Sequence, residues 1–122
     1  MGNGETSTVA QLVFFENITQ KGRQIPRNAA EMQELILSSG ASVTLAASAP
    51  PSFTGVQIGG CLYVNGTDAI SDYRRKKILA HEWFHWLRRP YIDDPLQIYC
   101  YSEHPHTRDI EEQYAKEFER LF

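Results

Sequence analysis

The sequence predicts a single α+β domain with an N-terminal helix, a small antiparallel or mixed sheet of about three strands, and two further helices. Apolar residues recur at helical spacing in three segments, and short β-prone segments bounded by Gly and Pro lie between the first two. The length of 122 residues is that of one domain, and the 42% hydrophobic content is typical of a globular protein. We therefore expect residues 1–122 to fold as one unit, with the small polar residues 1–8 as a flexible tail.

The first elements follow from local signals. Residues 9–15 are apolar enough to form a first strand or a helix turn. Asn28 followed by Glu31 predicts a helix cap, and apolar residues at helical spacing follow it until the Ser-Ser-Gly segment at 38–40. An amphipathic helix is therefore predicted here.

The predicted sheet comprises three short segments. Residues 43–46 alternate and are β-prone, and the Pro-Pro pair at 50–51 ends the first strand. Residues 55–58 and 61–64 flank Gly59-Gly60, as expected of a hairpin. We expect these segments to pair as a small sheet, with antiparallel order as the simplest arrangement.

Two helices complete the domain. Ser71 or Asp72 is expected to cap a long helix that ends at about Arg89, because Pro90 prevents its continuation. Residues 91–106 are predicted to form a loop. The last helix is expected to begin near Thr107 or Asp109 and to carry an apolar stripe to the end of the chain, with Ile110, Tyr114, Phe118 and Leu121.

The motif that carries chemistry is His81-Glu82-Trp83-Phe84-His85, within the long predicted helix. Histidines four apart on a helix lie on one face, so both imidazoles can reach the same metal ion. Zinc favours imidazole nitrogens, and a catalytic zinc site has three protein ligands with one position left for water. Glu82 follows the first histidine, where its carboxylate can act as the general base on that water. The motif therefore predicts a zinc site with His81 and His85 as ligands.

A third ligand is expected downstream, where several residues qualify: Glu103, His104, His106, Asp109, Glu111 and Glu112. Glu112 is preferred because it shares a helical stripe with Ala115, and a small residue one turn away allows two helices to approach closely. Glu111 remains open, because it lies nearer the middle of the apolar stripe. Both glutamates can also be solvated charges near a helix N-terminus.

The oxyanion of a tetrahedral transition state needs a further donor. Tyr99, Tyr101, His104 and His106 lie between the two ligand-bearing segments, and any of them can serve. For each residue taken singly, a surface position with its polar group in water is equally expected.

Two segments resemble the ImmA/IrrE family of metallopeptidases. Residues 73–85 (YRRKKILAHEWFH) are similar to the active-site helix of that family, and residues 112–118 (EQYAKEF) resemble its Glu-x-x-Ala-x-x-Phe pattern. A preceding strand at 61–65 also fits, and the resemblance covers roughly residues 28–122. Phe84 departs from the pattern, since that family usually has Gly before the second histidine.

The resemblance implies a small zincin-like domain of the glutamate type, with Glu112 as the third zinc ligand. It implies an endopeptidase that acts on a protein or peptide, such as a helix-turn-helix transcriptional repressor. One alternative is a non-catalytic zincin-like binding module that acts by protein contact. A less favoured alternative is a peptide-deformylase-type hydrolase, in which Cys61 would be a ligand.

Charge, hydropathy and cysteine usage predict which partners and which location the protein has. The formal charge is −3, and the only basic cluster, residues 74–77, is expected to be a solvated helix turn, so no direct nucleic-acid binding is predicted. No apolar run approaches the roughly 18 residues of a membrane span. Cys61 and Cys100 lack CxxC spacing, and no secretory leader precedes them, so free thiols and a cytoplasmic location are expected.

Overall fold

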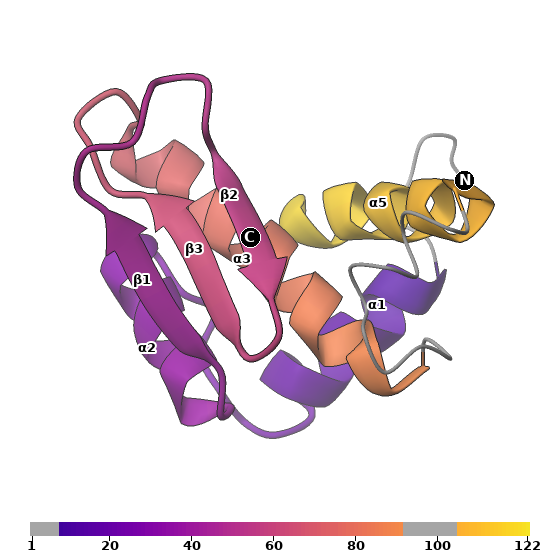
Figure 1. Cartoon of the computed structure of the whole chain (residues 1–122). Coiled ribbons are helices and arrows are strands. Elements are labelled where there is room, and N and C mark those ends of the chain that lie inside the picture. Colours follow the sequence, from indigo (N-terminus) through magenta and orange to yellow (C-terminus); the bar gives the residue numbers. More distant parts are fainter. Residues whose placement is uncertain (1–7, 92–104) are drawn as a thin grey trace.

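The computed structural model describes residues 8–91 and 105–122, which form a three-stranded sheet with helices packed on one of its faces (Figure 1). The elements in chain order are α1 (Thr8–Phe14), the π-helical turn η1 (Phe15–Thr19), α2 (Ala29–Ser38), β1 (Ser42–Ala46), β2 (Gly55–Ile58), β3 (Cys61–Asn65), α3 (Asp72–Arg88), the 3-10 turn η2 (Arg89–Tyr91) and α5 (Pro105–Glu119). The expected α+β class is confirmed.

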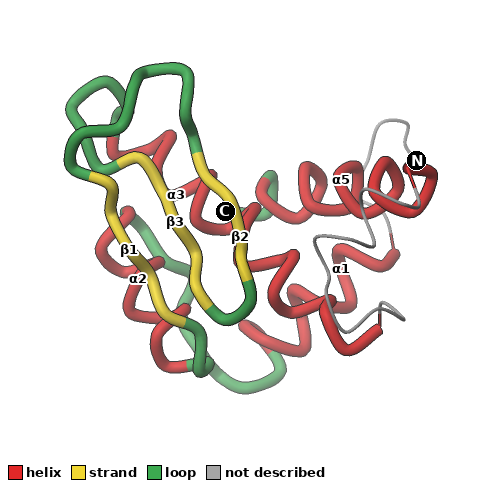
Figure 2. Tube along the Cα trace, viewed as in Figure 1, coloured by secondary structure: helices red, strands yellow, loops and turns green. Residues whose placement is uncertain are grey.

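The sheet is mixed, with strand order β1-β3-β2. β2 and β3 form the predicted hairpin, and Gly59 at its turn has a φ of 57°, a conformation that glycine adopts at no steric cost. β1 pairs with β3 in parallel, so the wholly antiparallel arrangement is wrong. The chain leaves β1, forms β2 on the far edge, and returns between them as β3 (Figure 2).

α2 and α3 cover the inner face of the sheet, where the side chains of Leu62 and Val64 are fully buried. Both predicted caps are present. The Asn28 side chain accepts a hydrogen bond from the Glu31 N–H at 2.9 Å, and the Ser71 hydroxyl accepts one from the Arg74 N–H at 3.1 Å. These bonds satisfy amide donors that have no partner within the helix, and so define where α2 and α3 begin.

Two element boundaries differ from expectation. Residues 9–14 belong to a helix, which excludes a first strand there. α5 begins at Pro105, before the predicted start at Thr107 or Asp109. Proline is well tolerated in the first turn of a helix, because an N–H at that position has no partner within the helix. Within the described part of the chain, no helix combines the length and apolar character that crossing a membrane requires.

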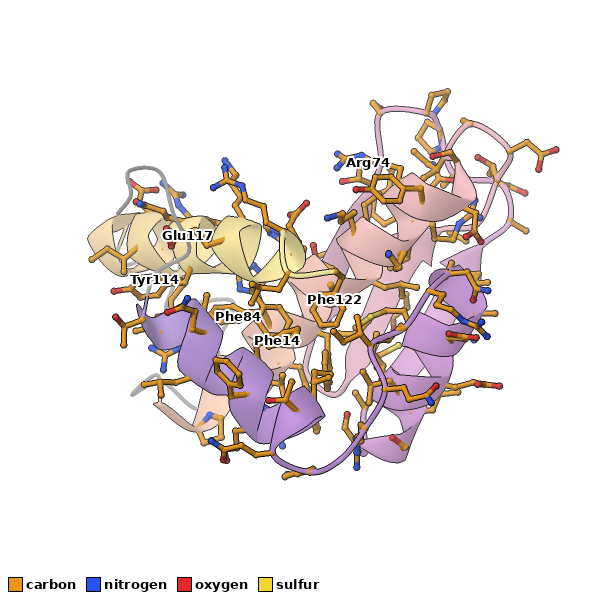
Figure 3. The ribbon with its side chains drawn as sticks, turned by 180° about the vertical axis from the view of Figure 1, so that it is seen from behind. Phe14, Arg74, Phe84, Tyr114, Glu117 and Phe122 are labelled. Atoms are coloured by element: carbon orange, nitrogen blue, oxygen red, sulfur yellow. The ribbon has the colours of Figure 1, made fainter. Side chains whose placement is uncertain are left out.

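An aromatic cluster joins α1, α3 and α5 (Figure 3). The ring centroids of Phe84 and Phe118 are 5.2 Å apart, and those of Phe14 and Phe122 are 5.4 Å apart. Phe84 and Phe118 are fully buried. The bulky residue before the second histidine thus fills the contact between α3 and α5, which contributes apolar burial and a tilted contact between two aromatic rings.

The basic cluster at 74–77 was expected to be a solvated helix turn, but three of its four side chains are bound to carbonyl oxygens. Lys76 is buried, and its Nζ donates to the carbonyl oxygen of Phe122, while Lys77 Nζ donates to that of Glu119. Arg75 is also bound, through the carbonyl oxygens of residues 65, 67 and 70. Glu119 is the last residue of α5, where a helix carbonyl has no partner within the helix and carries partial negative charge, so Lys77 binds there favourably; Phe122 follows three residues later.

Candidate metal centre

α3 places two histidines on one face, directed at α5. His81 and His85 lie one turn apart, and their ring centroids are 5.0 Å apart. Both side chains are largely buried, with 14% of His81 and 5% of His85 exposed. Such burial removes competing water and holds the imidazoles in one orientation.

α5 supplies a carboxylate to both histidines. The Glu112 oxygen Oε1 lies 2.9 Å from His81 Nε2, and Oε2 lies 2.8 Å from His85 Nε2. The donor atoms of these three residues all lie within 4.8 Å of one another. The group can therefore hold a metal ion.

The donor set fits zinc in chemistry and spacing. Two imidazole nitrogens and one carboxylate oxygen are ligands that catalytic zinc sites use. Zinc–ligand distances of about 2.0–2.2 Å in tetrahedral geometry separate the ligand atoms by about 3.3 Å. The Glu112 oxygens lie 2.8–2.9 Å from the two imidazole nitrogens, and the donor atoms of all three residues lie within 4.8 Å of one another, so side-chain adjustment can bring them to this spacing.

Glu119 contacts the other ring nitrogen of His81, with its Oε1 2.8 Å from Nδ1. A carboxylate in this position fixes the ring orientation and keeps Nε2 directed at Glu112. The sequence patterns had not predicted a role for Glu119. The available signal was its spacing, because Glu119 lies two turns after Glu112 on the same stripe of α5.

Glu111 points inward, as periodicity indicates, but it does not join the histidines. Its carboxylate binds Arg88 through two hydrogen bonds, from Nε at 3.0 Å and from a terminal nitrogen at 2.8 Å. This bidentate pair satisfies a buried carboxylate and links the C-terminal half of α3 to α5. The structure therefore assigns adjacent glutamates to different partners.

Burial and charge alter the proton affinities in this group. Burial by itself would lower the pKa of His81, but the hydrogen bonds from its ring to Glu112 and Glu119 outweigh burial and raise that pKa to about 9. The hydrogen bonds from His81 and His85 lower the pKa of Glu112. In Glu82, burial raises the pKa, and the nearby histidines only partly offset this. A buried carboxylate with a raised pKa is a suitable proton acceptor.

A cleft of about 480 Å³ opens over the site. His81, Glu82, Glu112 and Glu119 line it from α3 and α5, and Thr54 and Gly55 line it from the edge of the sheet. Gly55 is needed for this approach, because a Cβ atom there would lie 2.8 Å from Ile78 Cγ2 and 3.3 Å from Glu82 Cγ. β2 therefore packs directly against the helix turn that carries Glu82.

Several of the remaining candidates fall in the part of the chain that the structure does not describe. Tyr99, Tyr101, Glu103, His104 and Cys100 lie outside the described residues, as does the side chain of His106.

Asp109 and Cys61 are described, and neither belongs to the group. Cys61 is a free thiol whose sulfur lies 3.5 Å from the Thr44 hydroxyl, and its register in β3 directs it away from the face that carries Leu62. A Cys61 ligand, as the deformylase alternative requires, is not compatible with that position.

Comparison of the chain with protein-family models, with curated proteins and with solved structures finds no match. The site is therefore classified by its geometry alone. It is a candidate metal centre in an α+β domain, where two helices bring together two histidines and a glutamate.

The metal-free protein should lose stability as the pH rises from 6.5 to 9. The pKa of His81 is raised from 6.5 to about 9, so its ion pairs stabilise the fold fully below pH 6.5 and are lost as the pH rises through 9. Urea denaturation at pH 6, 7.5 and 9 with a chelator measures this change. His81→Gln should reduce the decline, and an equally steep decline in that variant would contradict the assignment.

Gly55→Ala should destabilise the fold by about 1–3 kcal/mol, because the added methyl overpacks the contact between β2 and α3. Gly60→Ala is the matched control, since the nearest atom to its Cβ would be Trp86 Nε1 at 3.9 Å, an ordinary contact. Thermal denaturation of both variants compares them. Equal stability would show that the close approach at Gly55 is not required.

Proposed function

We propose that this chain is a zinc-dependent endopeptidase in which His81, His85 and Glu112 hold the metal and Glu82 is the general base. The observation that carries the proposal is the convergence of Glu112 on both histidines, with Glu82 in the same cleft. A single helix face explains the two histidines, but a carboxylate from a different helix, bound to both rings, is the arrangement that a three-ligand metal site requires.

When bound, zinc would lower the pKa of a water ligand and polarise the carbonyl of a peptide bond. Glu82 accepts the proton of the attacking water and passes it to the nitrogen of the leaving amine. Its burial favours this role, because the carboxylate then has a raised proton affinity. Glu119 holds His81 Nδ1 and keeps the ring in place during the reaction.

The shape of the cleft supports a peptide substrate. β2 is an edge strand, with β3 on one side and no described strand on the other. An extended peptide can pair with such an edge through backbone hydrogen bonds, and Thr54 and Gly55 place this edge beside Glu82. The resemblance to the ImmA/IrrE family extends the proposal to a regulatory protein, such as a helix-turn-helix repressor, as the substrate.

Metal content tests the ligand set. After dialysis against zinc and then buffer, the native chain should retain one zinc ion, and Glu112→Ala should retain none because it lacks a ligand. Glu111→Ala should keep the metal, although loss of the Arg88 partner should reduce stability by about 3 kcal/mol. Elemental analysis of the folded fraction provides the measurement.

Loss of metal in Glu111→Ala with retention in Glu112→Ala would reverse the ligand assignment. A closed site with four protein ligands would instead favour a non-catalytic binding module, because structural zinc leaves no position for water.

Glu82→Gln should keep zinc and lose hydrolysis by about 10²- to 10⁴-fold, because the amide cannot accept the proton. Zinc-loaded protein is incubated with a mixture of synthetic peptides, and mass spectrometry identifies the products. His81→Ala is the companion variant and should lose both zinc and activity. Undiminished cleavage by Glu82→Gln would remove this mechanism.

A further inference from the structure

Three cations beside the site have no partner among the described residues. All twelve Lys and Arg residues of the chain lie in the described part, and the side chains of four make no hydrogen bond or ion pair there: Lys21, Arg74, Lys116 and Arg120. Arg74, Lys116 and Arg120 all line the cleft. Among the described residues, three of the four unpaired cations thus line the cleft of a protein whose net charge is −3.

α3 and α5 run in opposite directions, so the two ends of the cleft are lined by different parts of these helices. α3 and α5 are antiparallel, because Arg88 near the end of α3 binds Glu111 in the first half of α5, and Lys76 near the start of α3 binds the carbonyl of Phe122. The start of α3 and the end of α5 therefore meet at one end of the cleft.

The three cations extend from the site toward that end. Arg74 precedes His81 by seven residues, which is about 10 Å along a helix. Lys116 and Arg120 lie one and two turns after Glu112. Figure 3 shows Arg74 projecting from the N-terminal part of α3, away from the aromatic cluster.

The carboxylates of the cleft do not neutralise these cations. Three carboxylates line the cleft: Glu112 binds His81 and His85, Glu119 binds His81, and Glu82 forms no ion pair with the three cations. None of the described carboxylates forms an ion pair with Arg74, Lys116 or Arg120. Uncompensated cations along one wall of a cleft attract and orient an anionic ligand.

We propose that this end of the cleft binds a carboxylate of the substrate, on one side of the scissile bond and within roughly three residues of it, at about 3.3 Å per extended residue. The position of the scissile bond rests on the proposed function. An acidic peptide fits better than an extended polyanion, because the cations are confined to one end of a cleft of about 480 Å³.

Binding to zinc-loaded Glu82→Gln protein, which should not hydrolyse the ligand, tests the inference by fluorescence anisotropy. The probes are labelled seven-residue peptides with blocked ends: one with two glutamates, one with glutamines in their place and one with lysines. A fourth probe is the glutamine peptide with a free C-terminal carboxylate. The fourth probe distinguishes an acidic side chain from a chain end as the source of the carboxylate.

The glutamate peptide should bind about 5- to 20-fold more tightly than the glutamine peptide, since an exposed charge pair contributes up to about 5-fold. The lysine peptide should bind most weakly, and added salt should reduce the differences. The further substitutions R74Q, K116Q and R120Q together should abolish the preference. K21Q is the matched control, because Lys21 is an unpaired cation outside the cleft, and it should leave the preference unchanged.

Equal binding of the glutamate and glutamine peptides, or a preference that survives the triple substitution in folded protein, would overturn the inference. Preference only for the free C-terminal carboxylate would support the cationic end and identify a chain end as its ligand. Hydrolysis is measured separately with the native zinc-loaded protein. Its absence would reject the peptidase, whereas the binding preference would still decide whether the cleft selects carboxylates.

Discussion

The contact on which the rest of the site depends is the Glu112 carboxylate shared between His81 and His85. It joins two helices that are separate in the sequence, and it brings a carboxylate that is 41% exposed to two largely buried imidazoles. A charge on an imidazole that is buried to this degree is costly unless an opposite charge offsets it, so the shared carboxylate stabilises the pair of histidines. The same property allows the interface to hold a cation.

The register between α3 and α5 maintains this contact. The pair between Arg88 and Glu111 lies on one side of the histidines, and the bonds from Lys76 and Lys77 to the end of α5 lie on the other. The aromatic cluster fills the space behind them. A shift of one residue along α5 would rotate its side chains by about 100° and direct Glu112 away from the histidines.

The sheet determines the opposite wall of the cleft. Because Gly55 has no side chain, β2 approaches α3 closely enough to contact the turn that carries Ile78 and Glu82. Burial of Glu82 follows from this packing, and its raised pKa follows from that burial. The chemical character of Glu82 therefore depends on a residue in the sheet.

The sequence by itself determined the local features. The caps at Asn28 and Ser71, the hairpin at Gly59-Gly60 and the shared face of His81 and His85 are set by residues within a few positions, so short-range rules predict them. Tertiary structure decided the parallel pairing of β1, the binding of Lys76 and Lys77 to α5, and the separation of Glu111 from Glu112. The apolar periodicity favoured Glu111, and the stripe shared with Ala115 favoured Glu112. Only the packing of α5 on α3 directed Glu111 to Arg88 and Glu112 to the histidines. Those outcomes depend on where two distant helices meet, which no local pattern contains.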